Sequence, residues 1–141
     1  MLRLNAPGLA AIRRQAEAEY PDECCGAMLG RFGGAGMKET AEIRPIPNQR
    51  EGGARRRRFL IPAAEMFALE KYACSAGLEV LGFYHSHPDH PARPSGYDLD
   101  HAWPGYSYLI VAVPGGAAGE ALSWELTPDR RAFAAEELLE G

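Results

Sequence analysis

The sequence predicts one α/β domain, in which strands that alternate with helices form a central sheet. The chain has 141 residues, 46% of them hydrophobic, and this suffices for one domain around one core. Short apolar runs bounded by glycine and proline alternate with stretches whose apolar residues recur at helical spacing. One helical stretch connects two such runs, and a single-helix crossover is typical of an α/β unit. No repeat or linker is visible, so we expect residues 1–141 to form a single domain.

The first predicted element is a helix over residues 7–20. Leu9, Ile12 and Ala16 recur on one face, while most charged residues of the segment lie elsewhere. Pro21 ends this helix or starts a turn, because the residue before a proline is disfavoured in helical conformation.

Strands are predicted next. Residues 25–32 form a short apolar run that stops at a glycine-rich turn, and residues 39–46 resume the strand pattern. Residues 47–54 are rich in glycine, asparagine and proline and therefore read as a loop. A short strand is expected at residues 57–61.

The crossover helix follows. Pro62 suits the first turn of a helix, Met66 and Leu69 belong to its apolar stripe, and Gly77 ends it. Residues 78–87 then read as a strand, because Val80, Leu81 and Phe83 are apolar.

The C-terminal third continues the alternation. A proline-rich loop at residues 88–94 precedes a short helix at residues 95–103. Residues 106–113 give a strong signal for a buried strand, and residues 120–126 are expected to form another. Alanine and glutamate in residues 131–140 favour a helix, on propensity alone.

Composition excludes several classes of protein. A net charge of -4 argues against a general nucleic-acid binder. No stretch of about 18 apolar residues is present, so no membrane span is expected. The first 20 residues do not resemble a signal peptide, because charged residues interrupt their apolar positions. We therefore expect a cytoplasmic protein.

Three cysteines and an arginine run need separate interpretations. Cys24, Cys25 and Cys74 are an odd, low count that argues against a disulfide framework and fits reduced thiols in the cytoplasm. Such cysteines usually pack as small hydrophobic residues, and we expect this of all three. The run Arg55–Arg58 is either a solvated edge or a contact for an acidic partner surface or a C-terminal carboxylate.

The segment most informative about function is His85-Ser86-His87, which is followed after a short loop by Asp98. Histidines two positions apart on a strand point to the same face. Two imidazoles and one carboxylate are a common ligand set for catalytic zinc, with a fourth position for water. The alternative is structural: Ser95 and Asp98 also have the spacing of a helix capping box.

These residues resemble a known signature. His85-Ser86-His87, seven residues, Ser95, two residues and Asp98 look like the motif of the JAMM metallopeptidases, also called the MPN-plus or Mov34/PAD-1 family. The upstream glutamate of that signature matches Glu23, with Asp22 as its nearest rival. The resemblance runs from about Tyr20 to Val113.

The resemblance implies a role for each residue and a fold. His85, His87 and Asp98 resemble the zinc ligands, and Zn²⁺ is the implied cofactor. Glu23 resembles the general base that takes a proton from the zinc-bound water and later protonates the leaving amine. Ser95 resembles the residue whose hydroxyl stabilises the oxyanion. The implied fold is a three-layer αβα domain with a mixed central sheet, similar to that of cytidine deaminases.

The short chain looks most like the small prokaryotic branch of the family. That likeness implies hydrolysis of an amide or isopeptide bond after the C-terminal glycine of a ubiquitin-like protein. The implied partner is a sulfur-carrier protein ending in Gly-Gly, with no nucleic acid and no membrane involved. The bond broken would release an amino acid such as cysteine or process a carrier precursor.

Other functions stay open. Metal-free relatives of this domain act as binding or scaffold modules, and metal content discriminates them from the enzymes. A zinc hydrolase could also cleave a different amide, such as one in a small peptide. A zinc deaminase needs His-x-Glu and Pro-Cys-x-x-Cys, and a zincin protease needs His-Glu-x-x-His; the chain has none of these.

Overall fold

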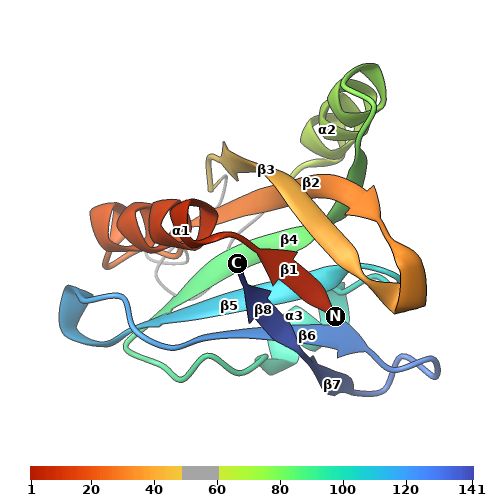
Figure 1. Cartoon of the computed structure of the whole chain (residues 1–141). Helices are drawn as coiled ribbons and strands as arrows, with labels where there is room; N and C mark the ends of the chain where they lie inside the picture. The colour runs from red at the N-terminus through yellow and green to blue at the C-terminus, as the bar shows by residue number, and fades with distance from the viewer. Residues whose placement is uncertain (49–60) are drawn as a thin grey trace.

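In the computed structural model, which describes residues 1–48 and 61–141, the strands form one eight-stranded sheet with helices on both faces (Figure 1). The strands are β1 Leu2–Leu4, β2 Cys25–Phe32, β3 Lys38–Ile46, β4 Glu79–Pro88, β5 Ser107–Val113, β6 Ala121–Leu126, β7 Phe133–Glu136 and β8 Leu138–Glu140. The helices are α1 Ala6–Glu19, α2 Ala63–Ser75 and α3 Gly96–His101, with short 3₁₀ turns at Gly34–Gly36 and Pro114–Gly116. In this described part of the chain, no helix is long and apolar enough to span a membrane.

The sheet is mixed, with strand order β7-β6-β5-β4-β2-β3-β1-β8. Strands β3 and β4 each pair antiparallel with β2, so α2 crosses between two strands that run in the same direction with β2 between them. Strands β4 and β5 are parallel neighbours joined through α3. The predicted α/β class and the implied mixed sheet are confirmed, and the strands joined by α2 are not neighbours.

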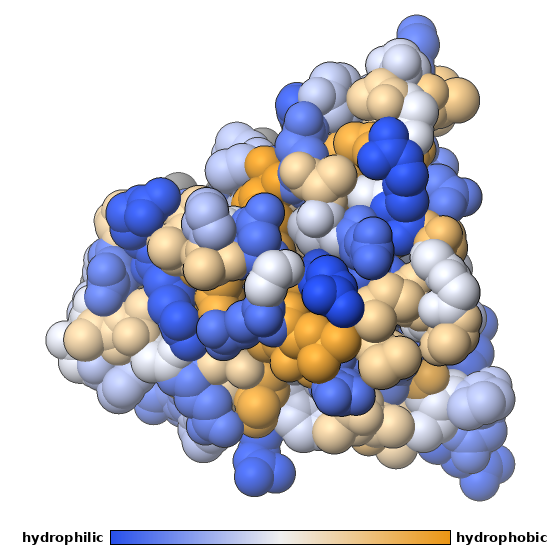
Figure 2. Space-filling model, in the orientation of Figure 1, coloured by the Kyte–Doolittle hydropathy of each residue, from blue (hydrophilic) through white to orange (hydrophobic). Residues whose placement is uncertain are grey.

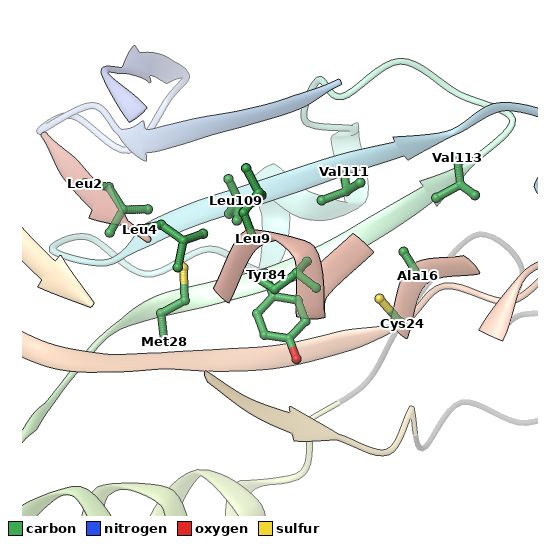
Figure 3. Packing of buried hydrophobic residues seen from close by; sticks show 11 residues of the cluster. Leu2, Leu4, Leu9, Ala16, Cys24, Met28, Tyr84, Leu109, Val111 and Val113 are labelled. Carbon is green, nitrogen blue, oxygen red and sulfur yellow. The ribbon is translucent and has the colours of Figure 1, made fainter. Parts of the chain in front are cut away.

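Apolar side chains alternate between the two faces of the sheet and build a core on each. On one face, α1 covers a cluster that includes Met28, Tyr84 and Leu109 (Figure 3). On the other face, residues of α2 pack against a cluster that includes Phe83 and Tyr108. The three layers place His85 and His87 on the α2 side, because they share the parity of Phe83 along β4.

The helices and strands predicted between residues 7 and 126 are present with closely similar bounds, wherever the structure describes them. The predicted strand at 57–61 and the run Arg55–Arg58 lie outside the described residues, apart from residue 61, which is in no strand. One side-chain prediction is wrong: Cys74, which we expect to pack as a small hydrophobic residue, is exposed. Cys24 and Cys25 are buried as expected.

The predicted helix at residues 131–140 is also wrong, because this tail forms β7 and β8. Pairing with the sheet overrides the weak helix propensity of its alanines and glutamates. Glu136 is buried there; it accepts a hydrogen bond from the Ser123 hydroxyl at 2.7 Å and lies 3.4 Å from the Met1 ammonium group. Strand β1, with only 3 residues, carries no periodic signal in the sequence.

The tail also joins the two edges of the sheet. Strand β7 pairs antiparallel with β6 at one edge, while β8 pairs parallel with β1 at the other. Only Glu137 separates β7 from β8, and its carbonyl accepts a hydrogen bond from the Leu2 amide at 2.9 Å. The sheet therefore curls until its edges meet, and Figure 1 shows β8 beside β1. Figure 2 shows the molecule in the orientation of Figure 1; the visible surface is mostly hydrophilic, with hydrophobic residues gathered near its centre.

Candidate metal centre

Two buried histidines stand at the carboxyl end of β4. His85 and His87 are 1% and 7% exposed, and their Nε2 atoms lie 3.2 Å apart. Pairing of β4 with β2 on one side and β5 on the other fixes the backbone that carries them. The predicted convergence of the two imidazoles on one face is therefore present.

Asp98 reaches the same point from the first turn of α3. Its Oδ1 lies 3.2 Å from His85 Nε2, and its Oδ2 lies 3.2 Å from His87 Nε2. The same carboxylate accepts the Ser95 amide at 2.8 Å, while the Ser95 hydroxyl accepts the Asp98 amide at 3.1 Å. The capping box and the histidine-carboxylate cluster are thus one arrangement, in which the helix cap orients Asp98 toward the histidines.

A backbone carbonyl sets the tautomer of His87. Its Nδ1 lies 2.9 Å from the Pro91 carbonyl oxygen, which can only accept a hydrogen bond. We therefore assign the proton of neutral His87 to Nδ1, which leaves a lone pair on Nε2. A histidine that ligates a metal commonly donates its other ring N–H in this way.

The charges of the cluster are strongly perturbed. Burial opposes ionisation of Asp98, but the two imidazoles outweigh burial and hold the pKa of that carboxyl well below its usual value. Burial lowers the pKa of His85. Burial also opposes protonation of His87, yet hydrogen bonds to Asp98 and the Pro91 carbonyl raise the pKa of His87 above its usual value. The result is an anionic oxygen pair facing two imidazoles inside the protein.

The arrangement fits a divalent metal ion. Three ligand atoms placed tetrahedrally at zinc-ligand distances would be separated by about 3.3 Å, close to the 3.2 Å contacts among His85, His87 and Asp98. Imidazole nitrogen and carboxylate oxygen are donors that zinc accepts. This donor set comes from β4 and α3, which the β4–α3–β5 connection brings together.

Glu23 lies at the edge of the cluster, just before β2. It is 2% exposed, and a carboxylate oxygen of Glu23 and a nitrogen of each histidine lie within 4.8 Å of one another. Glu23, His85 and His87 are therefore a second possible ligand set. The 3.2 Å contacts of Asp98 favour Asp98 as the third ligand, since no contact that short joins Glu23 to either histidine within residues 1–48 and 61–141. Burial raises the pKa of Glu23 to about 8.

A cleft of about 530 Å³ opens onto these residues. Glu23, His87 and Ser95 line it, together with residues that the sequence did not single out as functional: Pro88, His90, Pro91, Arg93 and Tyr97. Arg93 has no ion pair with any residue that the structure describes. Arg93 lies in the seven-residue spacer between His87 and Ser95, where the signature specifies no residue type, so only the fold reveals that it borders the cleft.

Comparisons with known proteins agree with this geometry. Residues 5–127 match the model of a family described as prokaryotic homologues of the JAB domain. A desampylase from Haloferax volcanii is 32% identical over 108 residues, which cover 76% of this chain and 74% of that protein. The solution structure of a protein from Salinibacter ruber is 38% identical, with a TM-score of 0.77 over 100% of this chain and 92% of that one. A protein from Desulfitobacterium hafniense is 26% identical, with a TM-score of 0.85 over 100% of this chain and 93% of that one.

Proposed function

The chain belongs to the prokaryotic homologues of the JAB domain, and we propose that it is a zinc-dependent hydrolase of a ubiquitin-like protein conjugate. The observation that carries the proposal is the mutual 3.2 Å approach of His85, His87 and Asp98, with the Glu23 carboxyl at the edge of the same cluster. The desampylase relative supports a ubiquitin-like substrate.

His85, His87 and Asp98 would hold the metal. When bound, zinc lowers the pKa of a water molecule and polarises the carbonyl of the bond to be cleaved. The Pro91 carbonyl holds the proton of His87 on Nδ1, so that Nε2 would be available to the metal, and the Ser95 amide orients the Asp98 carboxylate that would be the third ligand.

Glu23 is the proposed general base. Its carboxyl group lines the cleft, and no described side chain hydrogen-bonds it. Burial brings its pKa close to neutrality, where a carboxyl group both accepts and returns a proton efficiently. Glu23 therefore takes a proton from the attacking water and gives it to the departing amine.

Ser95 is the proposed oxyanion donor. Its oxygen already accepts the Asp98 amide, so the hydroxyl proton remains available to donate into the cleft that Ser95 lines. A hydrogen bond to charge that develops only in the transition state lowers the barrier.

The proposed substrate is a sulfur-carrier protein whose C-terminal glycine is joined to an amino acid. We expect the extended Gly-Gly tail to lie in the cleft that Pro88, Pro91 and Tyr97 line. The guanidinium of Arg93, unpaired among the described residues, would bind the carboxylate of the released amino acid. A conjugate to a lysine side chain within a protein would lack that carboxylate.

Metal content and turnover test the function together. We expect about one zinc per chain in the wild type and turnover of a carrier–cysteine conjugate. Glu23→Gln should keep zinc and lose turnover, whereas Asp22→Asn, which changes the neighbouring carboxylate in the same way, should keep both. Wild-type protein that takes up no zinc on reconstitution would instead be a binding module, and zinc-loaded protein that cleaves only small peptides would refute the carrier substrate.

A further inference from the structure

Side chains from two other segments hold the peptide group that joins Glu23 to Cys24. On one side, Asn48 Nδ2 donates to the Glu23 carbonyl oxygen at 3.0 Å. On the other side, the Cys24 amide donates to the Ser86 hydroxyl at 2.8 Å. Both polar groups of one peptide unit are therefore satisfied by side chains rather than by a neighbouring strand.

Side chains replace strand hydrogen bonds at this point because β2 stops pairing with β3 and β4 here. Both the β2–β3 and the β2–β4 registers end at Cys25, opposite Ile46 and His85 respectively. The peptide of Glu23 lies just beyond those ends, and it is buried, since Glu23 and Cys24 are 2% and 0% exposed. A buried peptide group without partners is costly, so the two side chains replace the missing strand contacts.

The position of this peptide governs the position of the Glu23 carboxyl group. No side chain within residues 1–48 and 61–141 hydrogen-bonds that carboxyl group, so its direction depends on its backbone and on packing. Ser86 lies between His85 and His87 on β4, and its amide also donates to the Cys24 carbonyl at 3.1 Å. The strand that carries the histidines thus also fixes the backbone of Glu23.

We propose that Asn48 and Ser86 are positioning residues that hold the Glu23–Cys24 peptide, and with it the Glu23 carboxyl group, in register with the histidines of β4. This inference rests on the proposed function, in which Glu23 is the base. Neither residue is among those that line the cleft. Asn48 and Ser86 approach from opposite sides of the peptide, on the segment after β3 and on β4, so both neighbours of β2 contribute.

Asn48→Asp is the principal test, because it keeps the shape of the side chain and removes the donor. We expect kcat on a carrier–cysteine conjugate to fall about 10- to 100-fold, since small misplacements of a catalytic group have effects of this size. KM and the zinc content should stay near wild type. Asn5→Asp is the matched control, because the Asn5 side chain accepts a hydrogen bond from the Gly8 amide as the cap of α1, and aspartate accepts equally well.

A purely structural role for Asn48 predicts a different pattern. If Asn48 acts through Glu23, its substitution should cause no further loss of the residual turnover in a Glu23→Gln background. Losses that multiply in the double variant, or a wild-type kcat in Asn48→Asp, would overturn the proposal.

Amide hydrogen exchange gives a readout that needs no turnover. The Cys24 amide should exchange slowly although it lies outside the strands, should exchange fast in Ser86→Ala, and should be slow again in Ser86→Thr, which restores the hydroxyl. Fast exchange at Cys24 in the wild type would overturn the proposal that Ser86 holds the Glu23–Cys24 peptide. Wild-type protein with no turnover but slow exchange at Cys24 would refute the proposed hydrolase and leave the hydrogen bonding of the Glu23–Cys24 peptide intact. Failure of the proposed function is therefore distinguishable from failure of this inference.

Discussion

Removing the ionisable group of Glu23 should change how the stability of the metal-free protein depends on pH. The carboxyl group ionises near 4.5 in the unfolded chain and, because burial disfavours its charged form, has a pKa of about 8 in the folded chain. Between these values the folded state binds more protons than the unfolded state. The free energy of unfolding must therefore fall as pH rises through this window.

The size of the effect follows from the two pKa values. Each unit of pKa difference corresponds to about 1.4 kcal/mol, so ionisation of Glu23 should lower the free energy of unfolding by about 2–3 kcal/mol between pH 5 and pH 7. Glu23→Gln removes this contribution and should make the metal-free protein more stable than wild type at pH 7. The raised pKa of His87 acts in the same direction; hydrogen bonds to Asp98 and Pro91 sustain it in both proteins, while the part due to the Glu23 charge disappears in Glu23→Gln, so the difference between the proteins reports ionisation of Glu23 together with its coupling to His87.

Urea unfolding of chelator-treated protein at several pH values from 5 to 8 measures this difference. Asp22→Asn should keep the wild-type slope, because the change at residue 22 leaves Glu23 intact. Added zinc should flatten the wild-type slope, since a nearby cation favours the charged carboxylate. Parallel stability curves for wild type and Glu23→Gln would refute the reasoning, because they would mean that the Glu23 carboxyl ionises alike in the folded and unfolded chains.

Three further predictions concern the metal and the cleft. His87→Ala should lose zinc, measured by elemental analysis, whereas His101→Ala, at an exposed histidine of α3, should keep it; retained stoichiometric zinc in His87→Ala would mean a wrong ligand set. Ser95→Ala should lose the α3 cap, worth about 1 kcal/mol of stability, and also lose kcat, while Ser95→Thr should keep both; an unchanged kcat in Ser95→Ala would remove its hydroxyl from the mechanism. Arg93→Ala should raise KM for a carrier–cysteine conjugate more than for its cysteine-amide analogue, with Arg131→Ala as an exposed control; equal effects on both substrates would contradict carboxylate recognition.

Short-range patterns made much of this site predictable. The spacing of His85 and His87 fixes their common face within one strand, and the capping box fixes Asp98 within one turn of helix. Both depend on residues close in sequence, so local geometry decides them. The resemblance to JAMM proteins added Glu23, which no local pattern singles out.

Long-range placement explains what the sequence left open. Glu23 approaches the histidines only because β2 pairs with β4, and Asn48 approaches Glu23 only at the end of the β2–β3 ladder. Arg93 borders the cleft because of how its loop folds. The tail forms strands against its helix propensity for the same reason, since β8 pairs with β1 at the other end of the chain.

The short tail has a consequence for how this protein avoids association. Unpaired edge strands are templates for intermolecular pairing, and here one segment of the chain covers two of them, β6 through β7 and β1 through β8. The tail closes the gap between the two edges of a nearly closed sheet. Detaching it would expose the unpaired backbone groups of β6 and β1 at once. The tail would also be the exchanged segment in a domain-swapped dimer, because β7 and β8 of one copy could pair with β6 and β1 of another without any new type of contact.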